Sequence, residues 1–289
     1  MSGGAGGGGL PLVVLAAGRA KRYGGCKPLA PIGPHGEAVI DLVASDALAA
    51  GFETVVLVLG PSTGPAIRYH VERTWPRLVD VQFALQEAPL GTVHAVLSAC
   101  EFIGDSPYAV SNADDIYGQA ACALLARHLR AAAPSNALVG YRLADAIIGS
   151  SEVTRGICRV SADGLLQGVD ERRKVVADGT GGFRSDDGQE PVDLSPDSRV
   201  SMNLWGFTPD FHKILQAAMA AATDASEEAE VLLPEVVGAS LESASFKVLP
   251  GQGRCIGVTH PDDLALVQAD IARQVGLGQR PGQLWGTPG

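Results

Sequence analysis

The 289 residues are 46% hydrophobic and 19% charged, values typical of a folded chain with a sizeable core rather than of a disordered one. A formal net charge of −10 argues against a general nucleic-acid-binding protein, which would carry a basic face. No apolar run approaches the roughly 18 residues of a membrane span. We therefore expect neither nucleic acid nor a membrane as a partner.

Residues 1–9 are nearly all glycine and lack the cationic start and apolar core of a signal peptide, so they predict a flexible tail. The five cysteines are scattered without a C-x-x-C pair. This distribution favours reduced thiols and a cytoplasmic location over a disulfide framework or a zinc site.

Strand-like and helix-like runs alternate along the first half of the chain. The runs expected to form strands are 12–15, 54–59, 79–85, 107–110 and 137–143. The runs expected to form helices are 40–48, 65–75, 92–100 and 119–132. Such alternation predicts crossover connections and a mostly parallel sheet with helices on both faces.

The second half changes character. Residues 156–176 predict a hairpin around Asp163-Gly164, and 178–199 predict an exposed, mobile loop because they are rich in Gly, Asp, Ser and Pro. Further strands are expected at 200–208, 246–249 and 255–258, and helices at 209–222 and 261–276. We expect a single domain over 10–275 and a second flexible tail over 276–289.

The most informative stretch is 12–34, LVVLAAGRAKRYGGCKPLAPIGP. A buried strand leads into two alanines and Gly18, and then into a cationic loop that contains Arg22 and Lys27. Small residues let the backbone approach a bulky anion, and the cations add charge suited to phosphate oxygens. The pattern predicts a polyphosphate site at the carboxyl end of the first strand.

Other interpretations of this loop are weaker. Gly25-Cys26-Lys27-Pro28 does not supply a Walker loop, and Gly18-Arg19-Ala20 breaks the dinucleotide fingerprint. A basic, glycine-rich loop without a ligand remains an alternative.

The same residues resemble the signature of the nucleotidyltransferase family of the nucleotide-sugar pyrophosphorylase type, which is close to L-A-A-G-x-G-x-R with a lysine downstream. Ala20 stands where that family usually has Gly or Ser. The resemblance implies nucleotide binding by the first motif and catalytic roles for Arg22 and Lys27. The residues that match the nucleotide-binding part are Leu15, Ala16, Ala17 and Gly18.

The resemblance extends over roughly 12–264. It implies an α/β fold of three layers, α/β/α and Rossmann-like, with a mostly parallel mixed sheet. By the same resemblance, 10–143 form a nucleotide-binding half and 144–275 an acceptor-binding half.

A second motif follows the third predicted strand and opens a helix, where backbone N–H groups are free for a ligand. It resembles the family element Q-x-x-x-x-G-T-x-x-A, which implies that Gln86, Gly91 and Thr92 bind the nucleotide base. A glutamine amide can both donate and accept, as base recognition requires. The alternative is a simple turn in which Thr92 caps its helix.

The third motif, Ser111-Asn112-Ala113-Asp114-Asp115, follows the fourth predicted strand. A carboxylate there, facing a triphosphate, suits Mg²⁺ with substrate oxygens as its other ligands. The motif resembles the family's metal-binding G-D or A-D dipeptide, which matches Ala113-Asp114. The resemblance implies that Asp114 is the metal ligand and that Asp115 supports it. A helix cap is the alternative, above all for Asp115.

The resemblance thins beyond this point. It implies Gly140, Glu171 and Asn203 as acceptor-binding residues, and Arg172 or Lys174 as a contact for the acceptor phosphate. The family's second metal carboxylate is expected on or just before the closing strand, where this chain has Arg254 and Thr259 instead. Asp262 or Asp263 are the candidates to replace it, although both also suit the start of a helix.

The implied reaction is transfer of a nucleoside monophosphate from an NTP to a phosphorylated acceptor, with Mg²⁺ as cofactor and pyrophosphate as product. A sugar 1-phosphate is the favoured acceptor. The alternatives are a molybdopterin-type or other non-sugar acceptor, and a nucleotide-binding regulator whose catalysis is impaired. The sequence leaves the base, the acceptor and the oligomeric state open.

Overall fold

The computed structural model describes residues 9–18, 25–226, 229–257 and 263–285. Two predicted site residues, Arg22 and Asp262, lie outside the described residues. So do residues 1–8 of the predicted N-terminal tail and 286–289 of the C-terminal one.

The first half forms one parallel block of the main sheet. The parallel order is β4–β1–β2–β3, from β4 (Tyr108–Asn112), β1 (Pro11–Ala16), β2 (Thr54–Leu59) and β3 (Asp80–Leu85). The central strands β1 and β2 are nearly continuous runs of Val and Leu because both faces are covered by helices. The helices of this half are α1 (Val39–Ala49), α2 (Gly64–Thr74), α3 (Gly91–Leu97), α4 (Cys100–Ile103) and α5 (Gln119–Leu129).

The second half extends the same sheet in a mainly antiparallel way. Its strands are β6 (Asn136–Arg142), β7 (Val153–Val160), β8 (Leu166–Ala177), β9 (Phe183–Ser185), β10 (Asp193–Leu194), β11 (Arg199–Phe207) and β12 (Phe246–Pro250). Its helices are α6 (Pro209–Ala225), α7 (Leu233–Ser240) and α8 (Leu264–Gly276). A separate two-stranded sheet joins β5 (Asp115–Ile116) to β13 (Ile256–Gly257).

Strand β11 connects the two parts of the sheet. It runs antiparallel to β6 on one side; on its other side it pairs with β4 through Trp205–Phe207 and with β7 through Val200–Ser201. The register against β6 shifts between Ser201 and Trp205, so β11 bulges where its partner changes from β4 to β7.

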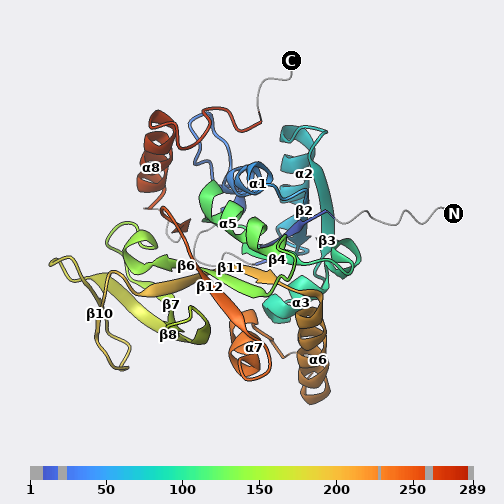
Figure 1. The fold of residues 1–289 in the computed structure, drawn as a ribbon. Coiled ribbons are helices and arrows are strands. Elements are labelled where there is room, and N and C mark those ends of the chain that lie inside the picture. Colours follow the sequence, from blue (N-terminus) through green and yellow to red (C-terminus); the bar gives the residue numbers. More distant parts are fainter. Residues whose placement is uncertain (1–8, 19–24, 227–228, 258–262, 286–289) are drawn as a thin grey trace.

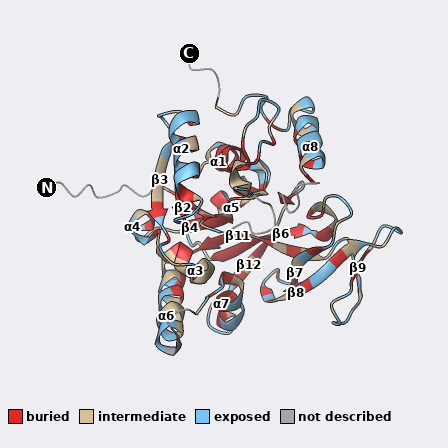
Figure 2. Cartoon of the chain, turned by 180° about the vertical axis from the view of Figure 1, so that it is seen from behind, coloured by how far each residue is buried: buried red, intermediate tan, exposed pale blue. Residues whose placement is uncertain are grey.

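Helices cover both faces of the sheet (Figure 1). Apolar side chains of α1, α2, α5 and α8 join one buried cluster, and those of α3, α6 and α7 join another on the opposite face. Figure 2 shows the buried residues concentrated in the strands between these layers. The three-layer α/β/α class predicted from the sequence is therefore confirmed, with antiparallel pairing dominating beyond β6. Among the described residues, no helix has the length and apolar character needed to cross a membrane.

Two expectations about loops need correction. Residues 178–199 contain the short strands β9 and β10: β9 pairs with β8, and β10 pairs with β9. Residues 277–285, expected to be part of a flexible tail, pack on α1: Arg280 is buried and both its terminal nitrogens donate to the Asp46 carboxylate at 2.7 Å. Trp285 also lies against Trp75, with ring centroids 5.5 Å apart.

Candidate active site

One cavity brings the three sequence motifs together. It has a volume of about 560 Å³ and opens at the carboxyl ends of β1 and β4, where open α/β sheets bind ligands. The predicted residues that line it are Leu15, Ala17, Gly18, Gln86, Gly91, Thr92 and Asp114. A smaller hollow of about 150 Å³ is lined by Ala16 and Lys27, and also by Leu15, Gly18 and Asp114.

Gln86 is held in a defined orientation in the cavity wall. Its side chain is buried, and its Nε2 donates to the Gly91 carbonyl oxygen at 3.0 Å. Nε2 also lies 3.2 Å from His94 Nδ1. Because the Gly91 carbonyl can only accept, the amide nitrogen must face it. The amide oxygen has no donor among the described residues, so Gln86 offers the cavity an acceptor.

Gly91 and Thr92 are fixed by a segment that comes far later in the chain. Gly91 has φ +89°, and a Cβ there would lie 2.3 Å from the Val231 carbonyl oxygen. Only glycine allows this approach without displacing the backbone. The Thr92 hydroxyl accepts a hydrogen bond from the Leu233 N–H at 2.8 Å, so it caps the first turn of α7 instead of its own helix.

Asp114 and Asp115 form an acidic pair after β4. Lys27 Nζ lies 3.6 Å from Asp114 Oδ2, and Asn112 Nδ2 donates to Asp115 Oδ2 at 2.8 Å. Loss of hydration raises the pKa of Asp114, and the Lys27 charge opposes that rise. Loss of hydration and the charge of Asp114 raise the pKa of Asp115 to about 7, although the bond from Asn112 opposes the rise. A bound cation would therefore stabilise the doubly ionised pair.

The proposed acceptor residues lie further along the sheet. Gly140, Ser201, Gly156 and Glu171 stand opposite one another on four successive strands. Gly140 is buried, and a Cβ there would meet Val248 Cγ1 at 2.8 Å, so this glycine also makes room for β12. Asn203 lies in the β11 bulge with φ +60°, and its Oδ1 accepts from Trp205 Nε1 at 3.3 Å.

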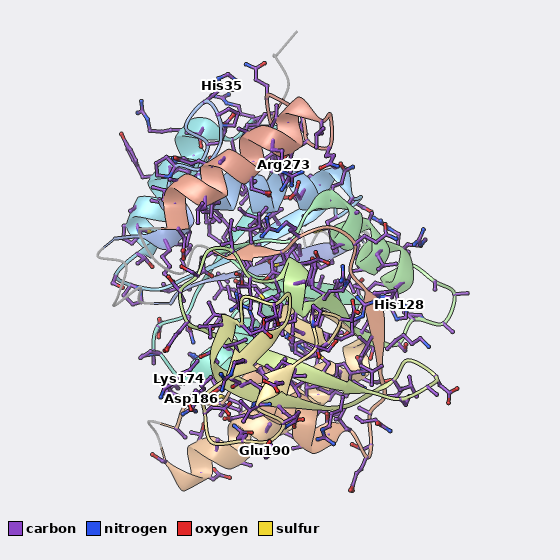
Figure 3. All side chains as sticks on the ribbon, turned by 90° about the vertical axis from the view of Figure 1, so that its left-hand side faces the viewer. His35, His128, Lys174, Asp186, Glu190 and Arg273 are labelled. Carbon is purple, nitrogen blue, oxygen red and sulfur yellow. The ribbon has the colours of Figure 1, made fainter. Side chains whose placement is uncertain are left out.

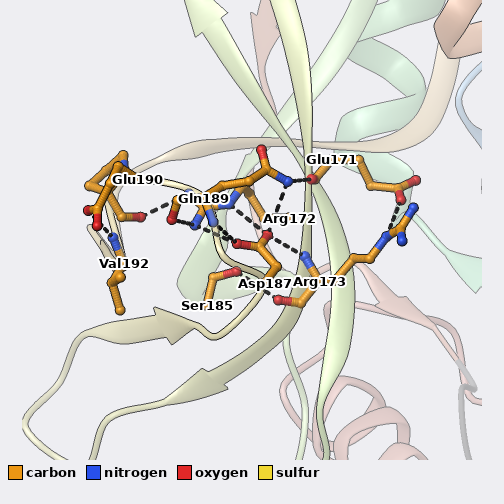
Figure 4. Close-up of polar contacts among 9 residues, drawn as sticks. Glu171, Arg172, Arg173, Ser185, Asp187, Gln189, Glu190 and Val192 are labelled. Carbon is orange, nitrogen blue, oxygen red and sulfur yellow. Dashed lines mark hydrogen bonds and ion pairs between the residues drawn. The ribbon is translucent and has the colours of Figure 1, made fainter.

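Arg172 and Lys174, the two cations suggested for the acceptor phosphate, are not among the residues that line the cavity. Arg172 is buried, and its Nε and Nη2 donate to the two carboxylate oxygens of Asp187 at 2.9 and 3.1 Å (Figure 4). Lys174 is exposed and lies near Asp186 at the outer end of β8 (Figure 3). Glu171, whose side chain is also exposed, accepts from Arg173 Nε at 2.9 Å.

The Arg172–Asp187 pair predicts a loss of stability in acid. The Arg172 guanidinium, helped by the N–H groups of Arg173 and Gln189, holds the pKa of Asp187 well below its usual range. Because the carboxyl pKa is lower in the folded than in the unfolded protein, the ion pair stabilises the fold at pH values above the unfolded-state pKa of about 3.9. This stabilisation is lost as the pH falls through the folded-state pKa. We expect Asp187→Asn to lower the melting temperature by several degrees at neutral pH, with a difference from wild type that shrinks below about pH 4.

The neighbouring exposed residue gives the matched control for this thermal series, because Asp186→Asn should melt like wild type at every pH. A constant gap between Asp187→Asn and wild type from neutral to acid pH would contradict the role of the charged pair.

The closing segment does not supply a clear second metal ligand. Asp263 is buried at the start of α8, and a Cβ on Gly149 would lie 3.2 Å from its Oδ1. Arg254 Nη2 donates to the Ile147 carbonyl at 3.0 Å and Nη1 lies 3.4 Å from Asp270 Oδ1, which makes Arg254 a structural residue. No group of three or more His, Cys, Asp or Glu within the described residues is arranged to hold a metal ion.

Two walls of the cavity were missed by the sequence analysis. One is the turn after β2, formed by Gly60, Pro61 and Ser62; the other contains Glu230 and Leu232. The Gly-Pro pair after a buried strand could have indicated the first wall. The second depends on the segment before α7, which hydrogen-bonds to the second motif through Leu90 and Val93 and which no local pattern indicates.

Together, the fold and this cavity define an α/β protein of the nucleotidyltransferase class. Residues 12–165, just over half of the chain, match the family model described as "MobA-like NTP transferase domain". The chain belongs to this family.

Comparison with solved structures supports the same fold. A UDP-glucose pyrophosphorylase from Acinetobacter baumanii superposes with a TM-score of 0.63, over 93% of this chain and 94% of that chain. The two sequences are 16% identical, so this likeness concerns the fold alone. No curated protein matches the chain in sequence.

Proposed function

We propose that this nucleotidyltransferase moves a nucleoside monophosphate from an NTP to a sugar 1-phosphate and releases pyrophosphate. The observation that carries the proposal is the single cavity that contains the small residues after β1, the Gln86–Thr92 element and Asp114. Its volume of about 560 Å³ suits a small-molecule ligand.

The chemistry requires positioning and charge neutralisation. An oxygen of the acceptor phosphate attacks the α-phosphorus of the NTP, and the bond to the pyrophosphate oxygen breaks in line with the attack. An ionised phosphate is already a nucleophile, so the reaction needs no general base. We assign Lys27 and Arg22 to neutralising charge on the phosphates, a role that preorganised cations perform well.

Mg²⁺ is the cofactor that this donor set suits. Magnesium is usually bound by one or two carboxylates together with substrate phosphates, and Asp114 with Asp115 could provide the carboxylates. When bound, the ion would neutralise developing charge on the phosphate oxygens. The rise in the pKa of Asp115 to about 7 is consistent with a pair that binds a cation.

Polar groups on β11 and β8 support a sugar as the acceptor. The Asn203 amide lies on β11, which is paired to β4, and the exposed Glu171 carboxylate ends the row that starts at Gly140. Carboxylates and amides are suitable partners for sugar hydroxyls because they accept or donate at fixed directions.

The test is pyrophosphate release with Mg²⁺ from each of the four NTPs, each against a pool of sugar 1-phosphates and, separately, against a phosphorylated pterin. We expect release with one nucleotide and one acceptor. Release only with a phosphorylated pterin would select the molybdopterin-type alternative. A thermal shift with an NTP but no release with any acceptor would select the regulator with impaired catalysis.

Lys27→Ala should separate catalysis from stability. We expect kcat/KM to fall about a hundredfold, because a cation facing the phosphates is removed. The free energy of unfolding should change by less than about 1 kcal/mol, since the ion-pair partner of Lys27 among the described residues is the partly exposed Asp114. Steady-state kinetics and urea unfolding measure the two effects.

Lys213→Ala is the control for that variant, because Lys213 is exposed and pairs with the exposed Asp210 on α6. Equal losses of activity and stability in Lys27→Ala would instead indicate a loop with a purely structural role.

A further inference from the structure

A buried tyrosine lies where the pairing partner of β11 changes from β4 to β7. Antiparallel pairing with β4 extends from Phe207 to Trp205 and then stops, because β11 bulges between Ser201 and Trp205. A bulge leaves backbone groups without their ladder partners. Such groups need other hydrogen bonds when they are buried.

Tyr117 provides these bonds. Its side chain is 1% exposed. Its hydroxyl accepts from the Asn112 N–H at 2.9 Å and donates to the Met202 carbonyl at 2.8 Å. One oxygen thus joins the last residue of β4 to the residue immediately before Asn203.

The backbone of Tyr117 is also anchored. Tyr141, on β6 and fully buried, donates its hydroxyl to the Tyr117 backbone carbonyl oxygen at 2.8 Å. From Asn112 the connection continues through its side-chain amide to the Asp115 carboxylate, next to Asp114. The chain of bonds runs from the acidic pair to the β11 bulge.

We infer that Tyr117 is a positioning residue that fixes the Asp114–Asp115 turn relative to Asn203, and so sets the distance between the reacting nucleotide and its acceptor. This inference rests on the proposed function. Tyr117 makes none of the contacts that orient Gln86, Gly91 or Thr92, so it should affect the meeting of the two reactants and leave nucleotide affinity unchanged.

The test is Tyr117→Phe, which keeps the ring and removes the bridging oxygen. With Mg²⁺ and the NTP and sugar 1-phosphate that wild type uses, we expect kcat per folded enzyme to fall about tenfold to a hundredfold. The KM for the acceptor should rise, and the KM for the NTP should stay within about twofold because the Gln86–Thr92 wall of the cavity is unchanged.

Tyr108→Phe is the matched control. Tyr108 lies at the start of β4, is fully buried, and its hydroxyl is bonded to His212 Nδ1 at 3.1 Å, away from the cavity. It should lose stability while keeping the kcat and both KM values of wild type. The same pattern in Tyr117→Phe, with loss of stability alone, would overturn the inference.

Two further measurements cover other outcomes. If Tyr117→Phe does not fold, Tyr141→Phe takes its place, because it removes the bond that holds the Tyr117 backbone and retains the bridging hydroxyl. A several-fold fall in kcat supports the inference, whereas wild-type kinetics contradict it. If wild type transfers to no acceptor, the proposed function fails, and the shift in melting temperature caused by Mg²⁺ with an NTP becomes the measurement. If Mg²⁺ with the NTP raises the melting temperature of Tyr117→Phe less than that of wild type, the role of Tyr117 in positioning the acidic turn is supported. Equal shifts in the two proteins overturn it.

Discussion

Asp114→Asn is expected to lower kcat by about a thousandfold, which corresponds to about 4 kcal/mol of transition-state stabilisation. The amide lacks the charge with which Asp114 would hold Mg²⁺ against the phosphates. The fold should survive, because the substitution also removes the repulsion that raises the pKa of Asp115. Single-turnover kinetics over a range of Mg²⁺ concentrations, together with urea unfolding, measure both effects.

An exposed aspartate on α6 provides the comparison for this variant: Asp224→Asn should retain full activity. Turnover of Asp114→Asn within a few-fold of wild type at saturating Mg²⁺ would remove Asp114 from the metal site. A parallel loss of folded protein would instead assign this residue a structural role.

Arg280→Ala is expected to destabilise the protein by about 3–5 kcal/mol, because it leaves the buried Asp46 carboxylate without its bidentate partner. Loss of hydration raises the pKa of Asp46, and Arg280 is the main group that opposes this rise. Without the guanidinium, burial of the ionised carboxylate is uncompensated, so the loss of stability should shrink in mildly acidic solution as Asp46 takes up a proton. Urea unfolding at neutral and mildly acidic pH measures the difference.

The paired substitution Asp46→Leu with Arg280→Met should recover most of this loss, because an apolar pair can replace a buried ion pair. Arg127→Ala, at an exposed position on α5, should change the unfolding free energy by less than about 0.5 kcal/mol. A loss of under about 1 kcal/mol in Arg280→Ala would show that residues 277–285 contribute little to the fold.

Local patterns were sufficient to predict much of this structure. Buried runs of Val and Leu identified β1 and β2, and the Asp163-Gly164 pair identified the hairpin of β7 and β8. The sequence also predicted that Gln86 and Asp114 would share one site with the loop after β1. These features depend on residues close together in the chain, or on the meeting of parallel strands at one sheet edge.

Contacts between distant segments could not be predicted in this way. Arg172 reads as part of a solvated basic run, yet Asp187, fifteen residues away, buries it. Composition suggested a loose tail around Arg280, whereas its partner Asp46 is 234 residues away. In both cases the sequence records the charges but not the pairing, which only the folded chain determines.

The place of β11 in the sheet limits how this enzyme could be rebuilt. Strands β4 and β6 both lie before residue 144, but they do not pair with each other: both pair with β11, which lies after it. The cavity wall at Glu230 and Leu232 also lies beyond residues 12–165. A chimaera that exchanged 144–275, the proposed acceptor half, for that of another protein would replace the strand that joins β4 to β6 and part of the cavity wall. Acceptor specificity should therefore be redesigned by substitutions on β8 and β11, because these two halves are not interchangeable modules.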